Sequence, residues 1–158
     1  MVKPDPEALS ERASQKSRTL INYRLRSEYE LRTRLAEHFE EETIDIAISQ
    51  MYSEGLLDDT RFTNWFVETK THSRPVSSRM IQRQLIRIGI KPDLARSATS
   101  DVNDNENALQ VAIKRSRATA HLPKNEFQRK MSQHLGRRGF SFEATSNAIK
   151  KSWALISK

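Results

Sequence analysis

The stretch SSRMIQRQLIRIGI at residues 77–90 holds, in one helix and one turn, the pattern that decides the fold. Ser77 is a good residue for the start of a helix, because its hydroxyl can accept a backbone N–H of the first turn. Ile81 and Leu85 then recur at the spacing that places them on one helix face. Gly89 suits the left-handed position that follows many helices. The stretch therefore predicts an amphipathic helix with one buried face, closed by a tight turn.

This helix-and-turn pattern occurs twice more in the chain, each time at a step of 50 residues. The paired apolar residues are Leu31 and Leu35, Ile81 and Leu85, and Met131 and Leu135. A further helix follows each turn, and its apolar residues are Ile44 and Ile48, Leu94 and Ala98, and Ala144 and Ala148. A three-helix unit has little core of its own and gains by stacking on its neighbours. The period predicts an all-α fold of three tandem three-helix repeats, about nine helices, elongated and curved.

Capping residues indicate where the helices begin and end. Ser27 and Glu30 form a capping box, Gly55 suits a helix C-terminus, and either Asp58 or Asp59 caps the helix that follows. That helix is expected to bury Phe62, Trp65 and Phe66. The predicted repeats comprise residues 1–57, which include an N-terminal helix, residues 58–102 and residues 103–158.

The composition argues against several classes of protein. The 158 residues include no cysteine, which excludes disulfides and thiolate chemistry. There is no Gly-rich phosphate loop, and the four histidines are scattered without metal-ligand spacing. The first residues lack the apolar segment of a signal peptide, and no apolar run approaches the ~18 residues of a membrane-spanning helix. We therefore expect a soluble, cytoplasmic monomer with no catalytic site, metal or cofactor.

The charge is distributed unevenly along the chain. The net charge is +7, but residues 1–69 carry 9 Lys and Arg against 14 Asp and Glu. Residues 70–100 carry 7 against 1, and residues 101–158 carry 11 against 5. An acidic first part joined to a basic remainder suggests two partner surfaces. The basic part is typical of a protein that contacts a polyanion, and nucleic acid is the expected partner.

The basic residues of the helix after Ser77 lie opposite its apolar face. Arg79, Arg83 and Arg87 follow one another at four-residue steps, about 6 Å apart along the helix axis. Arginine can bind phosphate through two parallel hydrogen bonds, so this stripe is a candidate contact with single- or double-stranded DNA. The third repeat adds candidate contacts at Lys114, Arg115, Lys130, Arg137 and Arg138. The alternative is that these side chains form a solvated cationic surface, and the last two also suit a helix C-terminus.

Four segments of the chain resemble the RecX family of bacterial recombination regulators. Gly55-Leu-Leu-Asp-Asp-Thr-Arg-Phe62 resembles the junction between the first two repeats of that family, and Arg26-Ser-Glu-Tyr-Glu-Leu31 resembles its upstream R-S-E-x-E-L motif. Ile81 to Leu85 with Gly89-Ile90, and Leu135 to Phe140, resemble two later motifs. The first repeat departs from the pattern, because it lacks the glycine before Phe39 and is one residue shorter there. Together the four segments, in order, cover about residues 17–153.

The resemblance implies a nine-helix regulator, without enzymatic activity, that binds RecA filaments on DNA. Members of the family lie in the filament groove and modulate ATP hydrolysis and strand exchange, and many are inhibitory. Two other classes stay open on the sequence. The helix pairs around Gly89 or Gly139 could belong to a stand-alone helix-turn-helix DNA-binding regulator. Asp58 and Asp59 could belong to a metal-dependent nuclease, although helix capping explains the pair as well.

Overall fold

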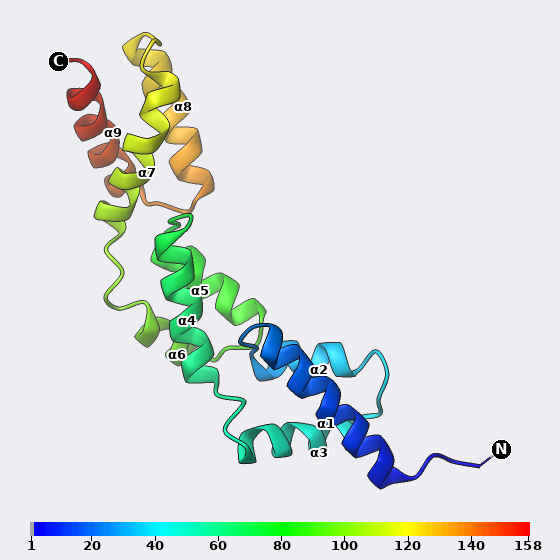
Figure 1. The fold of residues 1–158 in the computed structure, drawn as a ribbon. Helices are drawn as coiled ribbons and strands as arrows, with labels where there is room; N and C mark the ends of the chain where they lie inside the picture. Colours follow the sequence, from blue (N-terminus) through cyan, green and yellow to red (C-terminus); the bar gives the residue numbers. More distant parts are fainter. Residues whose placement is uncertain (1) are drawn as a thin grey trace. The chain divides into compact units, whose positions relative to one another are not determined.

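The computed structural model describes residues 2–158, and over that range the chain forms nine α-helices and no strand (Figure 1). The helices are α1 (Pro6–Tyr23), α2 (Glu28–Leu35), α3 (Glu41–Ser53), α4 (Asp59–His72), α5 (Ser78–Arg87), α6 (Pro92–Ala98), α7 (Asp104–Thr119), α8 (Lys124–Arg137) and α9 (Phe142–Ile156). The predicted all-α class and the number of helices are confirmed. None of these helices is both long and apolar enough to cross a bilayer.

The chain divides into two compact units, which do not follow the repeat boundaries expected after residues 57 and 102. Unit 1 comprises the described residues up to 66 together with residues 85–95. Unit 2 comprises residues 67–84 and 96–158. Helices α4 and α5 therefore contribute residues to both units. The three-repeat domain boundaries stay a prediction.

Each unit has its own apolar core, built from the residue pairs of the 50-residue period. In unit 1 the core centres on Leu31 and Leu35 of α2, packed with residues of α1 and α3. In unit 2 Met131 and Leu135 of α8 pack with residues of α7 and α9. All six paired residues of the period are at most 1% exposed. The predicted buried face of the first helix in each repeat is therefore confirmed.

Two details of the predicted core are wrong. Leu94 and Ala98 of α6 are only half-buried, and the buried residues are the following ones, Ala95 and Thr99. Thr99 accepts a hydrogen bond from Gln82 at 2.8 Å, so the buried face at this end of the short helix is partly polar. In α4, Phe62 is 1% exposed, whereas the two aromatic residues predicted to be buried with it, Trp65 and Phe66, are half-buried rings that contact it.

Glycines in left-handed conformation end three of the helices. Gly55, Gly89 and Gly139 have φ of 70°, 85° and 84°. After each of them a backbone N–H returns to the carbonyl five residues earlier, as Leu56 does to Met51 at 2.9 Å. These are the hydrogen bonds of the Schellman motif. The first repeat, which lacks the glycine, turns differently, because the Phe39 N–H returns to the carbonyl of Leu35, only four residues earlier.

Two of these glycine turns pack against the beginning of a helix from the preceding repeat. A Cβ atom on Gly89 would lie 2.2 Å from the Cβ of Tyr29, and one on Gly139 would lie 2.6 Å from Oγ of Ser77. Beside the Gly89 contact, the Ser27 hydroxyl donates a hydrogen bond to the carbonyl of Ile88 at 3.0 Å. In both places a side chain would occupy space that the neighbouring helix already fills.

The helix starts of α2 and α5 are completed by an aspartate from another helix. Asp59 accepts the N–H of Glu28, the first residue of α2, at 3.0 Å. Asp104 accepts both the N–H and the hydroxyl of Ser78, the first residue of α5, at 2.8 and 3.0 Å. Glu28 and Ser78 are 50 residues apart, so the same contact recurs with the period. Asp58, by contrast, caps its own helix by accepting the N–H groups of Thr60 and Arg61.

We expect Asp104→Ala to lower the free energy of unfolding by about 1–2 kcal/mol, the range typical of a lost helix cap. The substitution leaves the N–H and the hydroxyl of Ser78 without their acceptor. Urea denaturation followed by circular dichroism at the helix wavelengths measures the change. Asp101→Ala is the matched control, because Asp101 is an exposed aspartate three residues away that has no hydrogen bond or ion pair in the described residues. An equal loss in both variants would contradict the capping role.

Candidate nucleic-acid interface

The predicted arginine stripe lies on the exposed side of α5. Arg79, Arg83 and Arg87 are all exposed, whereas Ile81 and Leu85 on the opposite side are fully buried. Within residues 2–158, none of the three guanidinium groups has an acidic partner within ion-pair distance. The helix therefore presents three uncompensated positive charges to solvent. Ile86, which the sequence places near the arginine side, is 46% exposed beside them.

Unit 2 contains a cavity of about 410 Å³ whose ionisable lining is entirely basic. Its basic residues come from the end of α4, the loop after it, α7, and the C-terminal end of α8. They are His72, Arg74, Lys114, Arg115, His134 and Arg138. The other lining residues are uncharged. We call this site the basic cavity.

Arg138 fixes one wall of the basic cavity. Its guanidinium donates to the carbonyl of Pro75 at 3.1 Å, and its own carbonyl accepts the N–H of Ser77 at 3.0 Å. These two hydrogen bonds hold the loop between α4 and α5 against the end of α8. Because the loop is held, Arg74 and Pro75 become part of the same lining as Arg138.

His134 lies in this cavity in a strongly cationic environment. Burial lowers the pKa of His134 below its ordinary value, and the positive charges of Arg138, Arg115 and Arg137 lower it further. A lowered pKa means that the imidazole is neutral at neutral pH. In this state the imidazole can donate one hydrogen bond and accept another.

The structure brings together only some of the eight basic residues that the sequence predicted as nucleic-acid contacts. Lys114, Arg115 and Arg138 line the basic cavity, and the three stripe arginines share α5. Lys130 and Arg137 are exposed at α8 but outside the cavity lining. None of these positions is tested as a DNA contact, so all eight stay predictions.

Sequence reasoning missed three residues of the basic cavity. His72 and His134 lack any spacing that predicts a site, and Arg74 lies outside the helices that carry the predicted contacts. They meet Lys114 and Arg115 only through the packing of α4, α7 and α8. One signal was available, because residues 69–92 contain no acidic side chain at all. A segment of 24 residues without a carboxylate indicates a site of positive potential, although it does not identify the partner segments.

In unit 1, several basic residues form ion pairs with acidic ones. Arg18 pairs with Glu54 at 2.7 Å, Arg24 with Glu30 at 2.6 Å, and Arg32 with Asp45 at 2.7 Å. These ion pairs compensate much of the positive charge on this side of the chain. Unit 1 carries 11 Lys and Arg against 14 Asp and Glu, whereas unit 2 carries 16 against 6. The positive potential available to a polyanion is therefore concentrated in unit 2.

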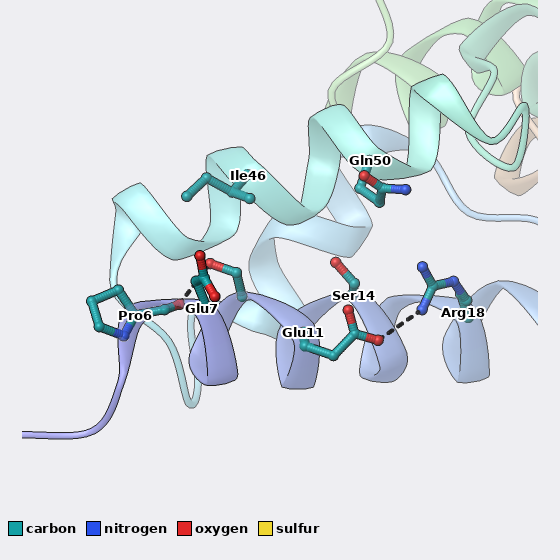
Figure 2. A pocket seen from close by; sticks show the side chains of 8 residues that line it. Pro6, Glu7, Glu11, Ser14, Arg18, Ile46 and Gln50 are labelled. Atoms are coloured by element: carbon teal, nitrogen blue, oxygen red, sulfur yellow. Dashed lines mark hydrogen bonds and ion pairs between the residues drawn. The ribbon is translucent and has the colours of Figure 1, made fainter.

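A second hollow lies between α1 and α3 of unit 1, and its chemistry does not suit an anion. Figure 2 shows Glu11 and Arg18 of α1 as an ion pair along its floor, with Ile46 and Gln50 of α3 above. Its volume is about 390 Å³, and its charged residues are two glutamates and one arginine. Within the described part of the chain, no group of three His, Asp or Glu side chains could hold a metal ion.

The comparisons with known proteins agree on one family. The model of the first three-helix domain of RecX matches residues 15–51, and that of the third three-helix domain matches residues 103–149. The regulatory protein RecX of Clostridioides difficile is 25% identical over 143 residues, which cover 89% of this chain and 68% of that protein. RecX of Lactococcus lactis is 28% identical over 136 residues, 82% of this chain and 50% of that protein.

The solved structures show the same fold. The crystal structure of RecX from Lactobacillus salivarius superposes with a TM-score of 0.77 at 21% identity, and the match covers 92% of this chain and 97% of that one. A second crystal structure of a regulatory protein RecX gives the same TM-score at 22% identity. The repeated helical fold predicted from the 50-residue period is therefore the fold of these two crystal structures.

Proposed function

The chain belongs to the RecX family of regulatory proteins, and on this basis we propose that it binds RecA–DNA filaments and inhibits RecA. Inhibition would act on ATP hydrolysis and strand exchange, and so on the regulation of DNA recombination and repair. RecA and the DNA that it coats, single- or double-stranded, are the proposed partners. The proposed role needs no cofactor and no membrane.

The uncompensated positive charge of unit 2 is the observation that supports this proposal most directly. Its 16 basic side chains against 6 acidic ones include Arg79 and Arg83 of α5 and the lining of the basic cavity. A protein that neutralises DNA phosphates with Lys and Arg releases counterions, and this release is a large part of its affinity. The acidic, ion-paired unit 1 would instead face RecA protein surface.

We further propose that inhibition arises from binding alone. A protein in the filament groove would obstruct the incoming duplex. It would also shift the filament away from its active form if it binds the inactive form more tightly, since a ligand shifts an equilibrium only by its differential affinity. The carboxylates considered for a nuclease have structural partners, because Asp58 caps α4 and Asp59 accepts the N–H of Glu28.

The test is ATP hydrolysis by preformed RecA filaments on single-stranded DNA, with the protein titrated in at about 50 and about 200 mM salt. We expect a dose-dependent fall in hydrolysis that is weaker at the higher salt. If three phosphate contacts contribute, the fourfold rise in salt weakens binding by roughly 20- to 40-fold. Unchanged hydrolysis together with no binding to filaments would overturn the RecA assignment. Sequence-specific duplex binding without RecA would then favour a stand-alone helix-turn-helix regulator.

A further inference from the structure

We propose that the basic cavity of unit 2 binds a phosphomonoester, a terminal phosphate group carried by the end of a DNA strand or by a free nucleotide. The inference deepens the proposed DNA contact and rests on it for the strand-end ligand. It does not require RecA. The stripe on α5 lies outside the cavity, so the two sites make separate predictions.

The cavity combines high positive charge with limited size. Four permanently cationic residues and two histidines line it, and no carboxylate does. Among the described residues, none of the four cations takes part in an ion pair. Its volume of about 410 Å³ is at the small end of the range for ligand pockets. A concave site of this size suits one phosphate group and a short attached part better than a continuous strand.

The number of converging cations favours a monoester over a diester. A phosphomonoester carries a charge of roughly −1.5 to −2 at pH 7 and presents three acceptor oxygens. A phosphodiester within a strand carries a single negative charge, for which one exposed arginine is sufficient. The basic residues of the lining belong to four segments, namely the end of α4, the loop after it, α7 and the end of α8. The hydrogen bonds of Arg138 to Pro75 and Ser77 hold two of these elements together before any ligand arrives.

His134 gives the site a measurable response. Burial lowers the pKa of His134, and the charges of Arg138, Arg115 and Arg137 lower it further. The other titratable groups that line the same cavity are His72, Arg74 and Lys114, all basic. A bound dianion opposes the effect of these positive charges. Occupation of the cavity therefore raises the pKa of His134 and allows its ring to donate from both nitrogens.

The experiment follows the imidazole signals of the four histidines by NMR while thymidine 5′-monophosphate or an oligothymidine is added to the whole protein. The oligothymidine is used with a 5′-phosphate, a 3′-phosphate or hydroxyls at both ends. We expect the phosphorylated ligands to shift His72 and His134 and to raise the pKa of His134. His38 and His121, which do not line the cavity, should not respond. Tighter binding of a phosphorylated strand than of the nucleotide identifies a strand end as the ligand, and the reverse order identifies a free nucleotide.

Paired charge-neutralising variants separate the cavity from the α5 stripe. Lys114→Gln with Arg115→Gln should weaken the affinity for thymidine 5′-monophosphate at least about tenfold, the effect of losing a hydrogen bond to a charged group. Arg79→Gln with Arg83→Gln removes the same charge from unit 2 outside the cavity and should change this affinity less than about twofold. Equal weakening in both variants, or equal shifts with the unphosphorylated strand, would overturn the proposal. Because RecA is absent, these results are independent of any failure to inhibit it.

Discussion

Replacing Gly89 with alanine is expected to lower the free energy of unfolding by roughly 2–5 kcal/mol, because two costs add at this position. The backbone has φ of +85°, a region where an L side chain is strained by roughly 1–2 kcal/mol. The new methyl group would also lie 2.2 Å from the Cβ and 2.7 Å from the Cγ of Tyr29, and the Cβ cannot move without the backbone of α2. Overpacking of this kind costs typically ~1–3 kcal/mol. Urea denaturation measures the sum.

Gly55→Ala is the matched control for Gly89→Ala within the same unit. Gly55 has φ of +70°, and an added Cβ would meet nothing within 4 Å. Its substitution carries only the backbone cost, partly offset by the reduced entropy of the unfolded chain, about 1 kcal/mol in total. The difference between the two variants therefore isolates the contact with Tyr29. If the two variants lose the same stability, this packing contact contributes nothing.

Charge reversal of the α5 stripe should abolish the proposed inhibition of RecA. The triple variant Arg79→Glu, Arg83→Glu and Arg87→Glu removes three cations that have no acidic partner to lose. Hydrogen bonds between charged groups contribute roughly 1.5–3 kcal/mol each, so binding to RecA–DNA filaments should weaken at least about 100-fold. The helix itself should persist, because all three side chains are exposed and Ile81 and Leu85 are untouched. Filament ATP hydrolysis and the circular dichroism spectrum report these two expectations.

The control for this variant reverses three positive charges at other positions in the chain. Lys150, Lys151 and Lys158 are exposed residues in or after α9, outside the α5 stripe and the basic cavity. Their replacement by glutamate should leave inhibition within a fewfold of the original, because only long-range attraction changes and salt screens it. A folded stripe variant that still inhibits would remove α5 from the interface. Equal losses in both triple variants would show that total charge matters and position does not.

Much of the fold could be predicted because its signals are local. The capping box of Ser27 and Glu30 and the glycines at 55, 89 and 139 mark helix ends through contacts within a few residues. The period of 50 residues identified the buried pairs. The choice between Asp58 and Asp59 stayed open, since either residue can cap the same helix in sequence. The structure separates them through Glu28, a partner 31 residues away that no local pattern reveals.

The sequence predicts the part of the candidate interface whose residues all lie on one helix, the α5 stripe, but not the basic cavity, whose residues come from several segments. The α5 stripe follows from helical spacing alone, and its exposure is as expected. The basic cavity needs His72, Lys114 and Arg138 at one place, which depends on how three helices pack. The error in α6 has a similar origin. The apolar character of Leu94 predicts that this residue is buried, but the buried residues are Ala95 and Thr99, and Thr99 accepts a part-buried hydrogen bond from Gln82 that the hydrophobic pattern does not indicate.

The recurring contacts at the helix starts also bear on how an array of such repeats can grow by duplication. The first helix of one repeat depends on the next, because Ser27 and Glu28 bond to Ile88 and Asp59, and Ser78 bonds to Asp104. A copied repeat must therefore supply an aspartate to its predecessor and receive one from its successor. Helix α8 begins differently, with Pro123 as its N-cap, no side-chain cap and an exposed first residue, Lys124, whose N–H can bond to water. A repeat that starts in this way makes no such demand on a successor, so a repeat of this kind could end an array.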